Sequence, residues 1–263
     1  MNSVGTWESG YVAQHVGSKE DAWGGTKENV MLVGKNKLTD IIEGSTTDAN
    51  VLLMSDDANG DAMFVDDIYS ASPDELGLSQ SRIAQIDEIR AGAGNDIVDM
   101  TSDKFEYTGD GLTIRGGDGN DTIWANKGDN WLFGDAGNDR IVGASGNDVI
   151  AGGIGNDRMH GGGGDDIFTF CDNWGTDTVE QLAGGYVTLW FTSEMEGKVA
   201  WDDLSESYTD GVNHVSVKGI SSVELKFGGV GEDAAMFATL SEAGAFKEFT
   251  SQKIFEENKG LLA

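Results

Sequence analysis

Six nine-residue units follow one another without a gap from Gly116 to Thr169: GGDGNDTIW, ANKGDNWLF, GDAGNDRIV, GASGNDVIA, GGIGNDRMH and GGGGDDIFT. Glycine fills position 4 of every unit and is common at positions 1 and 2. Position 6 is Asp or Asn, and position 8 is always apolar. A seventh unit, AGAGNDIVD at 91–99, follows the same pattern upstream. Such regular repetition predicts an array of stacked structural units.

Each unit divides into a turn and a short strand. Glycine permits positive φ, so the first six residues can make a tight turn. The last three residues, polar–apolar–polar, predict a minimal strand with one side chain pointing inward. One such strand cannot bury its apolar residue alone, whereas stacked coils can. Two units therefore make one coil of a flattened parallel solenoid, and the six units make three coils.

Turns one coil apart lie above one another on the same edge of such a solenoid. The two expected columns of position-6 side chains are Asp121, Asp139 and Asp157, and Asn130, Asp148 and Asp166. Carboxylates in a column would lie about 5 Å apart and repel one another unless a cation lies between them. Ca²⁺ suits this position because it accepts many oxygen ligands in flexible geometry. The columns predict four sites, at 121/139, 139/157, 148/166 and, more weakly because Asn replaces one carboxylate, 130/148.

The unit resembles the calcium-binding nonapeptide repeat of the RTX (repeat-in-toxin) family. The resemblance implies an all-β fold, a right-handed parallel β-roll that holds Ca²⁺ between stacked turns, with about three to five ions. A glycine-rich flexible linker is the alternative, but a linker would not keep Asp and an apolar residue in register. The candidate calcium ligands are Asp121, Asp139, Asp148, Asp157, Asp166, Asn130, Asp96, Asp118, Gly116, Gly134, Gly137, Gly143, Gly146, Gly152, Gly155, Gly161, Gly164, Asn120, Asn138, Asn147, Asn156, Asp165 and Asp177.

The segments around the array predict three parts. Residues 1–85 contain short apolar runs, and two of them, TDIIE and GDAMFV, look like degenerate coils. The β-roll is expected over 86–180, with less regular turns such as YTGDGL at 107–112. In 181–263, the runs YVTLWF, KVAWDD, NHVSVKG and VELKF predict a small β cap. A helix around 242–258 would follow, either as a secretion signal or as a capping helix.

Composition agrees with a calcium-dependent fold. The chain has 46 acidic and 17 basic residues, a formal net charge of −29 and a pI near 4.1. This balance argues against nucleic acid as a partner, since such binding needs Lys and Arg. Without Ca²⁺, self-repulsion should oppose compaction of the array. The single cysteine, Cys171, excludes an intrachain disulfide framework.

The targeting features are those expected of an RTX protein. The N-terminal residues MNSVGTWESG form no ordinary secretory signal, and no apolar run reaches the length of a membrane span. RTX proteins leave Gram-negative cells by type I secretion, which reads an uncleaved C-terminal signal. The resemblance therefore implies the type I secretion machinery as a partner and a secreted or cell-surface location, with calcium-induced folding outside the cell.

The motifs give no support for catalysis. The histidines His15, His160 and His214 form no HExxH pair, and a G-x-S-x-G elbow is absent from the sequence. We therefore expect a non-catalytic module. Two alternatives remain: a ligand- or carbohydrate-binding end module of a large RTX adhesin, suggested by seven Trp residues, and a hydrolase with an unrecognised site in 1–85 or 185–230. The sequence does not predict the oligomeric state.

Overall fold

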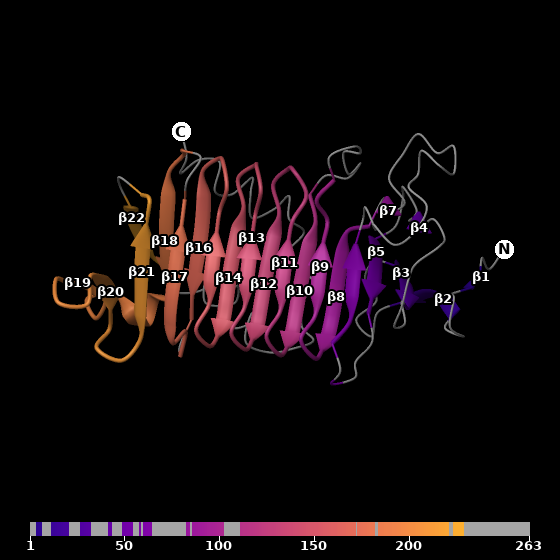
Figure 1. The fold of residues 1–263 in the computed structure, drawn as a ribbon, viewed down its shortest axis with the longest axis horizontal. Helices are drawn as coiled ribbons and strands as arrows, with labels where there is room; N and C mark the ends of the chain where they lie inside the picture. The colour runs from indigo at the N-terminus through magenta and orange to yellow at the C-terminus, as the bar shows by residue number, and fades with distance from the viewer. Residues whose placement is uncertain are drawn as a thin grey trace.

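The chain folds into two long, facing β-sheets (Figure 1). The structure is a computed structural model, and the residues it describes are 4–6, 12–20, 27–32, 42–43, 49–54, 58, 60–64, 83–84, 86–102, 111–171, 173–181, 184–220 and 223–228. Almost all regular structure in these residues is strand; a single 3-10 turn, η1, spans Ser193–Met195. None of the described segments is a helix long and apolar enough to cross a membrane.

The first sheet has eleven strands. In spatial order they are β1 (Val4–Thr6), β2 (Val12–Glu20), β3 (Lys27–Leu32), β5 (Ala49–Leu53), β8 (Glu88–Ala93), β10 (Thr113–Asp118), β12 (Trp131–Ala136), β14 (Val149–Ile154), β16 (Asp166–Phe170), β18 (Val187–Phe191) and β22 (Val223–Phe227). Pairing is antiparallel from β1 to β3 and parallel at every later step.

The second sheet has nine strands. In spatial order they are β6 (Ala62–Phe64), β9 (Ile97–Asp99), β11 (Thr122–Trp124), β13 (Arg140–Val142), β15 (Arg158–His160), β17 (Thr176–Glu180), β21 (His214–Lys218), β20 (Ser207–Thr209) and β19 (Ala200–Asp202). It is parallel from β6 to β21, and β20 and β19 add an antiparallel hairpin. A separate pair joins β4 (Ile42–Glu43) to β7 (Ile83–Ala84).

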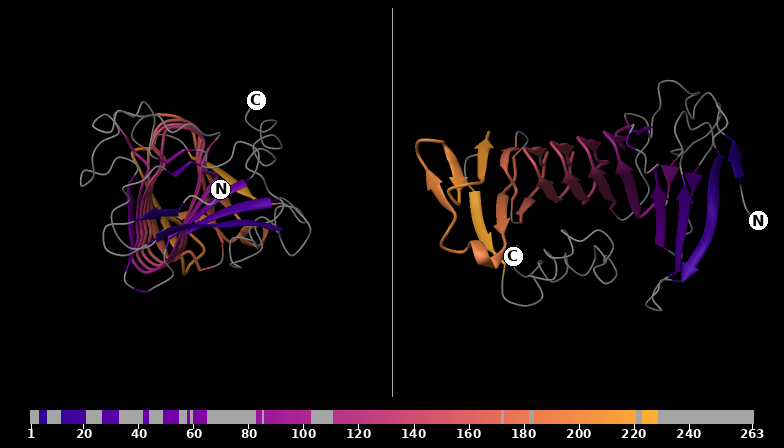
Figure 2. Two further views of the ribbon diagram at one scale, coloured as in Figure 1. Left: turned by 90° about the vertical axis from the view of Figure 1, so that its right-hand side faces the viewer. Right: turned by 90° about the horizontal axis from the view of Figure 1, so that it is seen from below.

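From β8 to β18 the chain alternates between the two sheets, so each pair of strands closes one coil. Seen along the solenoid axis, the coils superpose into a flattened tube (Figure 2, left). Within the tandem array the register step is 18 residues, because Ile114 pairs with Leu132 and Leu132 with Ile150. Two nonapeptides therefore make one coil, which confirms the predicted parallel β-roll.

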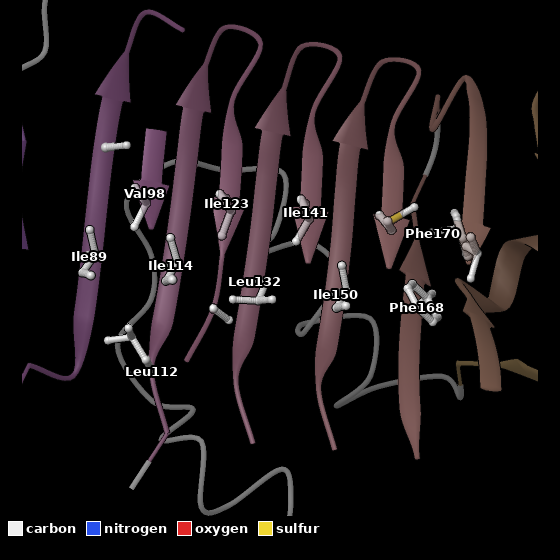
Figure 3. Close-up of a cluster of buried hydrophobic side chains, with 14 of the residues drawn as sticks. Ile89, Val98, Leu112, Ile114, Ile123, Leu132, Ile141, Ile150, Phe168 and Phe170 are labelled. Atoms are coloured by element: carbon white, nitrogen blue, oxygen red, sulfur yellow. The ribbon is translucent and has the colours of Figure 1, made fainter. Parts of the chain in front are cut away.

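The apolar position-8 residues form the core. Figure 3 shows a row of side chains from the first sheet, among them Ile114, Leu132 and Ile150, facing a second row that includes Ile123 and Ile141. The inward side chains of both sheets are at most 1% exposed: Ile89, Ile114, Leu132, Ile150, Phe168, Leu189, Val98, Ile123, Ile141, Met159 and Val179. Complete burial of such a side chain contributes roughly 1.5–3 kcal/mol. The repeat is stable only as a stack, because each inward side chain needs the coils above and below it.

The roll extends beyond the tandem repeats on both sides. Upstream, Met63 pairs with Val98, so the GDAMFV segment continues the second sheet, while Ile42 of TDIIE lies in the separate two-stranded pair. Of the YTGDGL turn, residues 107–110 lie outside the described residues. The domain boundaries at residues 85 and 180 stay predictions.

The structure differs from the expected cap over 185–230. Instead of packing a separate small sheet on the end of the roll, β18 and β22 continue the first sheet and β21 continues the second. The β19–β20 hairpin departs from the coil path (Figure 1). Aromatic rings fill this end of the core: Phe191 stacks on Phe170 and Phe227, with ring centroids 5.0 and 5.9 Å apart. The helix expected at 242–258 lies outside the described residues.

Candidate metal sites at the two edges of the roll

The turns lie on two edges of the flattened tube. We call the first edge the set of turns that lead from the first sheet to the second; it carries Asp61, Asp96, Asp121, Asp139, Asp157 and Asp177. The second edge contains the turns that lead back to the first sheet; it carries Asn130, Asp148 and Asp166. All nine residues are at most 8% exposed.

The carboxylates of the first edge are stacked in a column by backbone hydrogen bonds. The N–H of Asp121 donates to Oδ1 of Asp139 over 2.7 Å, and the N–H of Asp139 donates to Oδ1 of Asp157 over 2.8 Å. The same bond links Asp96 to Asp121 (2.7 Å) and Asp157 to Asp177 (2.8 Å). The vertical neighbours expected from the repeat are therefore present, and the column continues above and below them.

The second oxygen of these carboxylates is buried without a hydrogen bond. The Oδ2 atoms of Asp121, Asp139, Asp157 and Asp177 have no hydrogen-bond partner among the described residues. Leaving a buried carboxylate oxygen unsatisfied is costly, and native proteins rarely tolerate it. Repetition of the same orphaned atom in successive coils points to a missing ligand shared by these turns.

Glycine at position 1 lets the unpaired oxygens of Asp121, Asp139 and Asp157 approach the backbone more closely than any other residue would allow. A Cβ atom on Gly134 would lie 2.2 Å from Oδ2 of Asp139 and 2.4 Å from the carbonyl oxygen of Gly152. On Gly116 it would lie 2.3 Å from Oδ2 of Asp121. A carboxylate oxygen and a carbonyl oxygen from the next coil thus both lie close to the face where glycine has no side chain. A hard cation such as Ca²⁺ prefers oxygen ligands of these two kinds.

A cation at these turns could be held mainly by backbone carbonyls. In the described part of the chain, no three His, Cys, Asp or Glu side chains gather into a group able to hold a metal by themselves. The turns of Asp121, Asp139 and Asp148 instead bring the carboxylate close to the carbonyl oxygen of the position-1 glycine in the next coil. This donor set consists of oxygen atoms alone, and it fits calcium better than it fits zinc or copper.

Burial raises the pKa of these carboxyl groups in the metal-free protein. The pKa of Asp139 rises to about 8 because burial disfavours the charged form, and the charges of Asp157 and Asp121 add to the effect. Burial likewise raises the pKa of Asp121 to about 6, that of Asp157 to about 6 and that of Asp177 to about 9. Without a cation, the column therefore tends to take up protons.

The second edge has one turn of the same kind. The N–H of Asn130 donates to Oδ1 of Asp148 over 2.8 Å, and the N–H of Asp148 donates to Oδ1 of Asp166 over 2.9 Å. Oδ2 of Asp148 is orphaned among the described residues, and burial raises the pKa of this carboxyl to about 8. A Cβ on Gly143 would lie 2.3 Å from that oxygen.

Amide side chains occupy both ends of this second column. The Nδ2 of Asn130 donates to the carbonyls of Gly128 (2.6 Å) and Asn126 (2.9 Å). At the other end, the Nε2 of Gln181 donates to Oδ2 of Asp166 over 2.7 Å. One amide therefore lies one coil before the site at Asp148, and the other contacts the carboxylate one coil after it.

The position-5 side chains serve a different purpose. They lie on the outside of the turns, and their oxygens accept backbone N–H groups: Asn120 binds Asn138, Asn138 binds Asn156, Asn147 binds Asp165, Asn156 binds Thr176 and Asp165 binds Tyr186 over 2.7–2.9 Å. This ladder fastens each coil to the next. Asp118, at position 3, is exposed. The structure therefore brings together the position-6 and position-1 residues, and it places these side chains outside the turns.

The position-4 glycines allow the turns to stack closely. Gly137, Gly146, Gly155 and Gly164 have φ values between 127° and 150°. A Cβ on Gly155 would lie 1.5 Å from the carbonyl oxygen of Gly137, so only glycine fits. Sequence reasoning did not identify two residues of these turns. Asp61 could have been found as an Asp directly before an apolar run, whereas Gln181 has no repeat signature.

Comparison with known families agrees with this geometry. The family model for the RTX calcium-binding nonapeptide repeat (4 copies) matches residues 84–99, 107–141 and 133–168. The chain therefore contains an RTX calcium-binding repeat region, and the stacked turns described above form its β-roll. Comparison with curated proteins gives no match. Asp61 and Asp177 extend the first column beyond the matched residues.

Proposed function

We propose that this chain is a module whose β-roll is completed by Ca²⁺ at the orphaned position-6 oxygens. The proposal rests on the buried Oδ2 that has no hydrogen-bond partner in turn after turn of the described residues. In Asp121, Asp139, Asp157 and Asp148 this oxygen lies against a position-1 glycine. On the first edge the sites would use Asp121, Asp139, Asp157 and Asp177. Asp96 lies in the same column. On the second edge the site would use Asp148.

Bound calcium supplies positive charge between stacked carboxylates. The residues of the chain supply oxygen ligands and a rigid spacing: the carboxylate of position 6, the carbonyl of the position-1 glycine, and other turn carbonyls. In this arrangement the carboxylates stay ionised although they are buried, because a cation offsets both desolvation and mutual repulsion. Calcium binding then opposes the proton uptake that burial otherwise favours.

Calcium also controls whether the roll folds. For a site with a dissociation constant of about 10 μM, about 1 mM Ca²⁺ adds roughly 2.7 kcal/mol to stability. Several independent sites would together add an amount comparable with the whole stability of a domain. The net charge of −29 works in the opposite direction without calcium, because like charges oppose compaction.

This coupling suits export from a Gram-negative cell. At the low calcium concentration of the cytoplasm, the array stays unfolded and can pass through the type I secretion machinery. Outside the cell, calcium folds the roll and makes the passage irreversible. The module is non-catalytic in this proposal and belongs to a secreted or cell-surface protein. The repeat region and the acidic balance support this scheme.

A calcium titration followed by far-UV circular dichroism tests the proposal. The full chain is first treated with a chelator and then titrated with Ca²⁺, and with Mg²⁺ as the control. We expect a cooperative transition from coil to β-sheet with Ca²⁺ and little change with Mg²⁺, since Mg²⁺ demands a tighter octahedral shell. A spectrum that is β-rich in chelator and indifferent to calcium would contradict the proposal.

The β19–β20 hairpin favours a second candidate function, that of a ligand-binding end module. Its Trp201 is 48% exposed and packs edge-on against Tyr208, with ring centroids 5.1 Å apart. Leu204 and Val212 beside it are 97% and 81% exposed. An exposed aromatic ring can stack on a sugar or a peptide. Binding to a glycan array that is lost in Trp201→Ala, with the calcium transition intact, would support this candidate.

A further inference from the structure

We propose that Asn130 and Gln181 are built-in substitutes for the cation at the two ends of the second column. As a result, the second edge takes a single calcium ion, at Asp148. The inference rests on the proposed calcium binding at position 6 and names the residues that limit it. It also replaces the expectation of a weak ion between residues 130 and 148.

Gln181 occupies the place of a position-1 glycine. The N–H groups at position 1 donate to the last carbonyl of the second-sheet strand in the next coil: Gly143 to His160 (2.9 Å), Gly161 to Glu180 (3.2 Å) and Gln181 to Lys218 (3.2 Å). Glycine has no side chain at this point, whereas the side chain of Gln181 reaches the turn of Asp166. Its Oε1 lies 2.4 Å from the position that a Cβ on Gly161 would take.

The Gln181 amide nitrogen meets three oxygen atoms. It donates to Oδ2 of Asp166 over 2.7 Å and approaches the carbonyls of Gly164 and Gly184, each at 3.1 Å. Gln181 is only 3% exposed, so these contacts lie away from solvent. A buried nitrogen surrounded by one carboxylate and two carbonyl oxygens occupies the environment that suits a small cation.

Asn130 produces the same arrangement from a different position in the repeat. Its Nδ2 approaches the carbonyls of Gly128 (2.6 Å) and Asn126 (2.9 Å) and Oδ1 of Asp148 (3.1 Å). Both amides therefore contact the carbonyl of a position-4 glycine: Asn130 contacts Gly128 of its own turn, and Gln181 contacts Gly164 of the Asp166 turn, one coil earlier. Two unrelated side chains that reach equivalent oxygens indicate that the turn requires a donor at this point.

The turn of Asp148 differs from the turns that the two amides contact, and this difference explains why the second edge takes one ion. At Asp166, Oδ1 accepts the N–H of Asp148 and Oδ2 accepts the Gln181 amide, so both oxygens are satisfied by the protein. At Asp148, Oδ2 has no hydrogen-bond partner among the described residues. The amide nitrogens donate hydrogen bonds to oxygens that calcium would otherwise bind. Oε1 of Gln181 itself accepts no hydrogen bond among the described residues.

Counting bound calcium by native mass spectrometry of the full chain tests the inference. Asn130→Asp replaces the amide with a carboxylate, and Gln181→Gly reopens the position-1 space. We expect each variant to bind one more ion than the wild-type protein. The matched control is Asn138→Asp, which adds a carboxylate at an outward-facing position 5 and should leave the count unchanged.

A second variant covers the case in which Gln181→Gly does not fold. Gln181→Glu keeps the side-chain length but places an oxygen beside Asp166, so the fold should require more calcium than the wild type and bind one additional ion once folded. Folded variants with the wild-type ion count would overturn the inference. A wild-type chain that binds no calcium would instead overturn the proposed function, so the two failures are distinguishable.

Discussion

Asp139→Asn should have opposite effects with and without calcium. The N–H of Asp121 donates to Oδ1 of Asp139 over 2.7 Å. The substitution keeps an oxygen that can accept this bond and removes the charge. Without calcium, the buried charge of Asp139 destabilises the folded state. With calcium, the same charge is a ligand. The variant should therefore make the metal-free chain fold more easily and make the folded chain respond less to calcium.

The pKa of Asp139 gives the magnitude of the first effect. It rises to about 8 from an ordinary value of 3.8, so at pH 7 the fold carries a penalty set by the difference between pH 7 and the ordinary pKa. At 1.36 kcal/mol per unit this is roughly 4 kcal/mol, reduced to roughly 2–4 kcal/mol by water at the turn. The loss of one calcium site removes roughly 3 kcal/mol at about 1 mM Ca²⁺.

Circular dichroism at two calcium levels measures both effects. In chelator, folding is induced with trimethylamine N-oxide, which favours compact states, and the variant should fold at a lower concentration than the wild type. The urea midpoint is also measured in 1 mM Ca²⁺ and in chelator with osmolyte. The rise in this midpoint on adding calcium should be smaller for the variant than for the wild type. Asn138→Asp, at the adjacent outward position, serves as the control. A variant that folds less readily in chelator, or that retains the full calcium gain, would refute the reasoning.

Three other predictions follow from the same structure. Gly134→Ala places a Cβ 2.2 Å from Oδ2 of Asp139, so calorimetry should show calcium affinity at least tenfold weaker, with Ser145→Ala unchanged. Acidification from pH 8 to pH 5 should stabilise the metal-free fold, because the raised carboxyl pKa values mean that the folded chain binds protons that the unfolded chain does not. Calcium affinity should fall over the same pH range. A metal-free fold that loses stability in chelator over this range would contradict the prediction. Ile150→Ala, in the core at 0% exposure, should cost about 2–4 kcal/mol in calcium, whereas outward-facing Val142→Ala should cost less than about 1 kcal/mol.

The periodic part of the fold could be predicted because its physics is local. Glycine at fixed positions permits the turn, and one apolar residue in nine sets the inward face, so Ile123 and Ile141 were expected one above the other and are paired. The column of Asp121, Asp139 and Asp157 follows from the same period. Neither inference requires knowledge of distant contacts.

The non-repetitive parts could not be predicted because they depend on partners far along the chain. The run that contains Val223 has the composition of a strand in a small cap, yet it pairs with Val187 in the first sheet. Gln181 has no repeat signature, and its role comes from a turn that Asp166 and Gly164 create. The choice between stacking on the roll and packing across its end depends on side chains that no local pattern specifies.

The most direct measurement is an anomalous difference map from crystals of the full chain grown with calcium. We expect peaks beside the Oδ2 atoms of Asp121, Asp139, Asp157, Asp177 and Asp148, and none at the amide nitrogens of Asn130 and Gln181. Peaks confined to the outer position-5 residues, or water at the position-1 glycines, would contradict it.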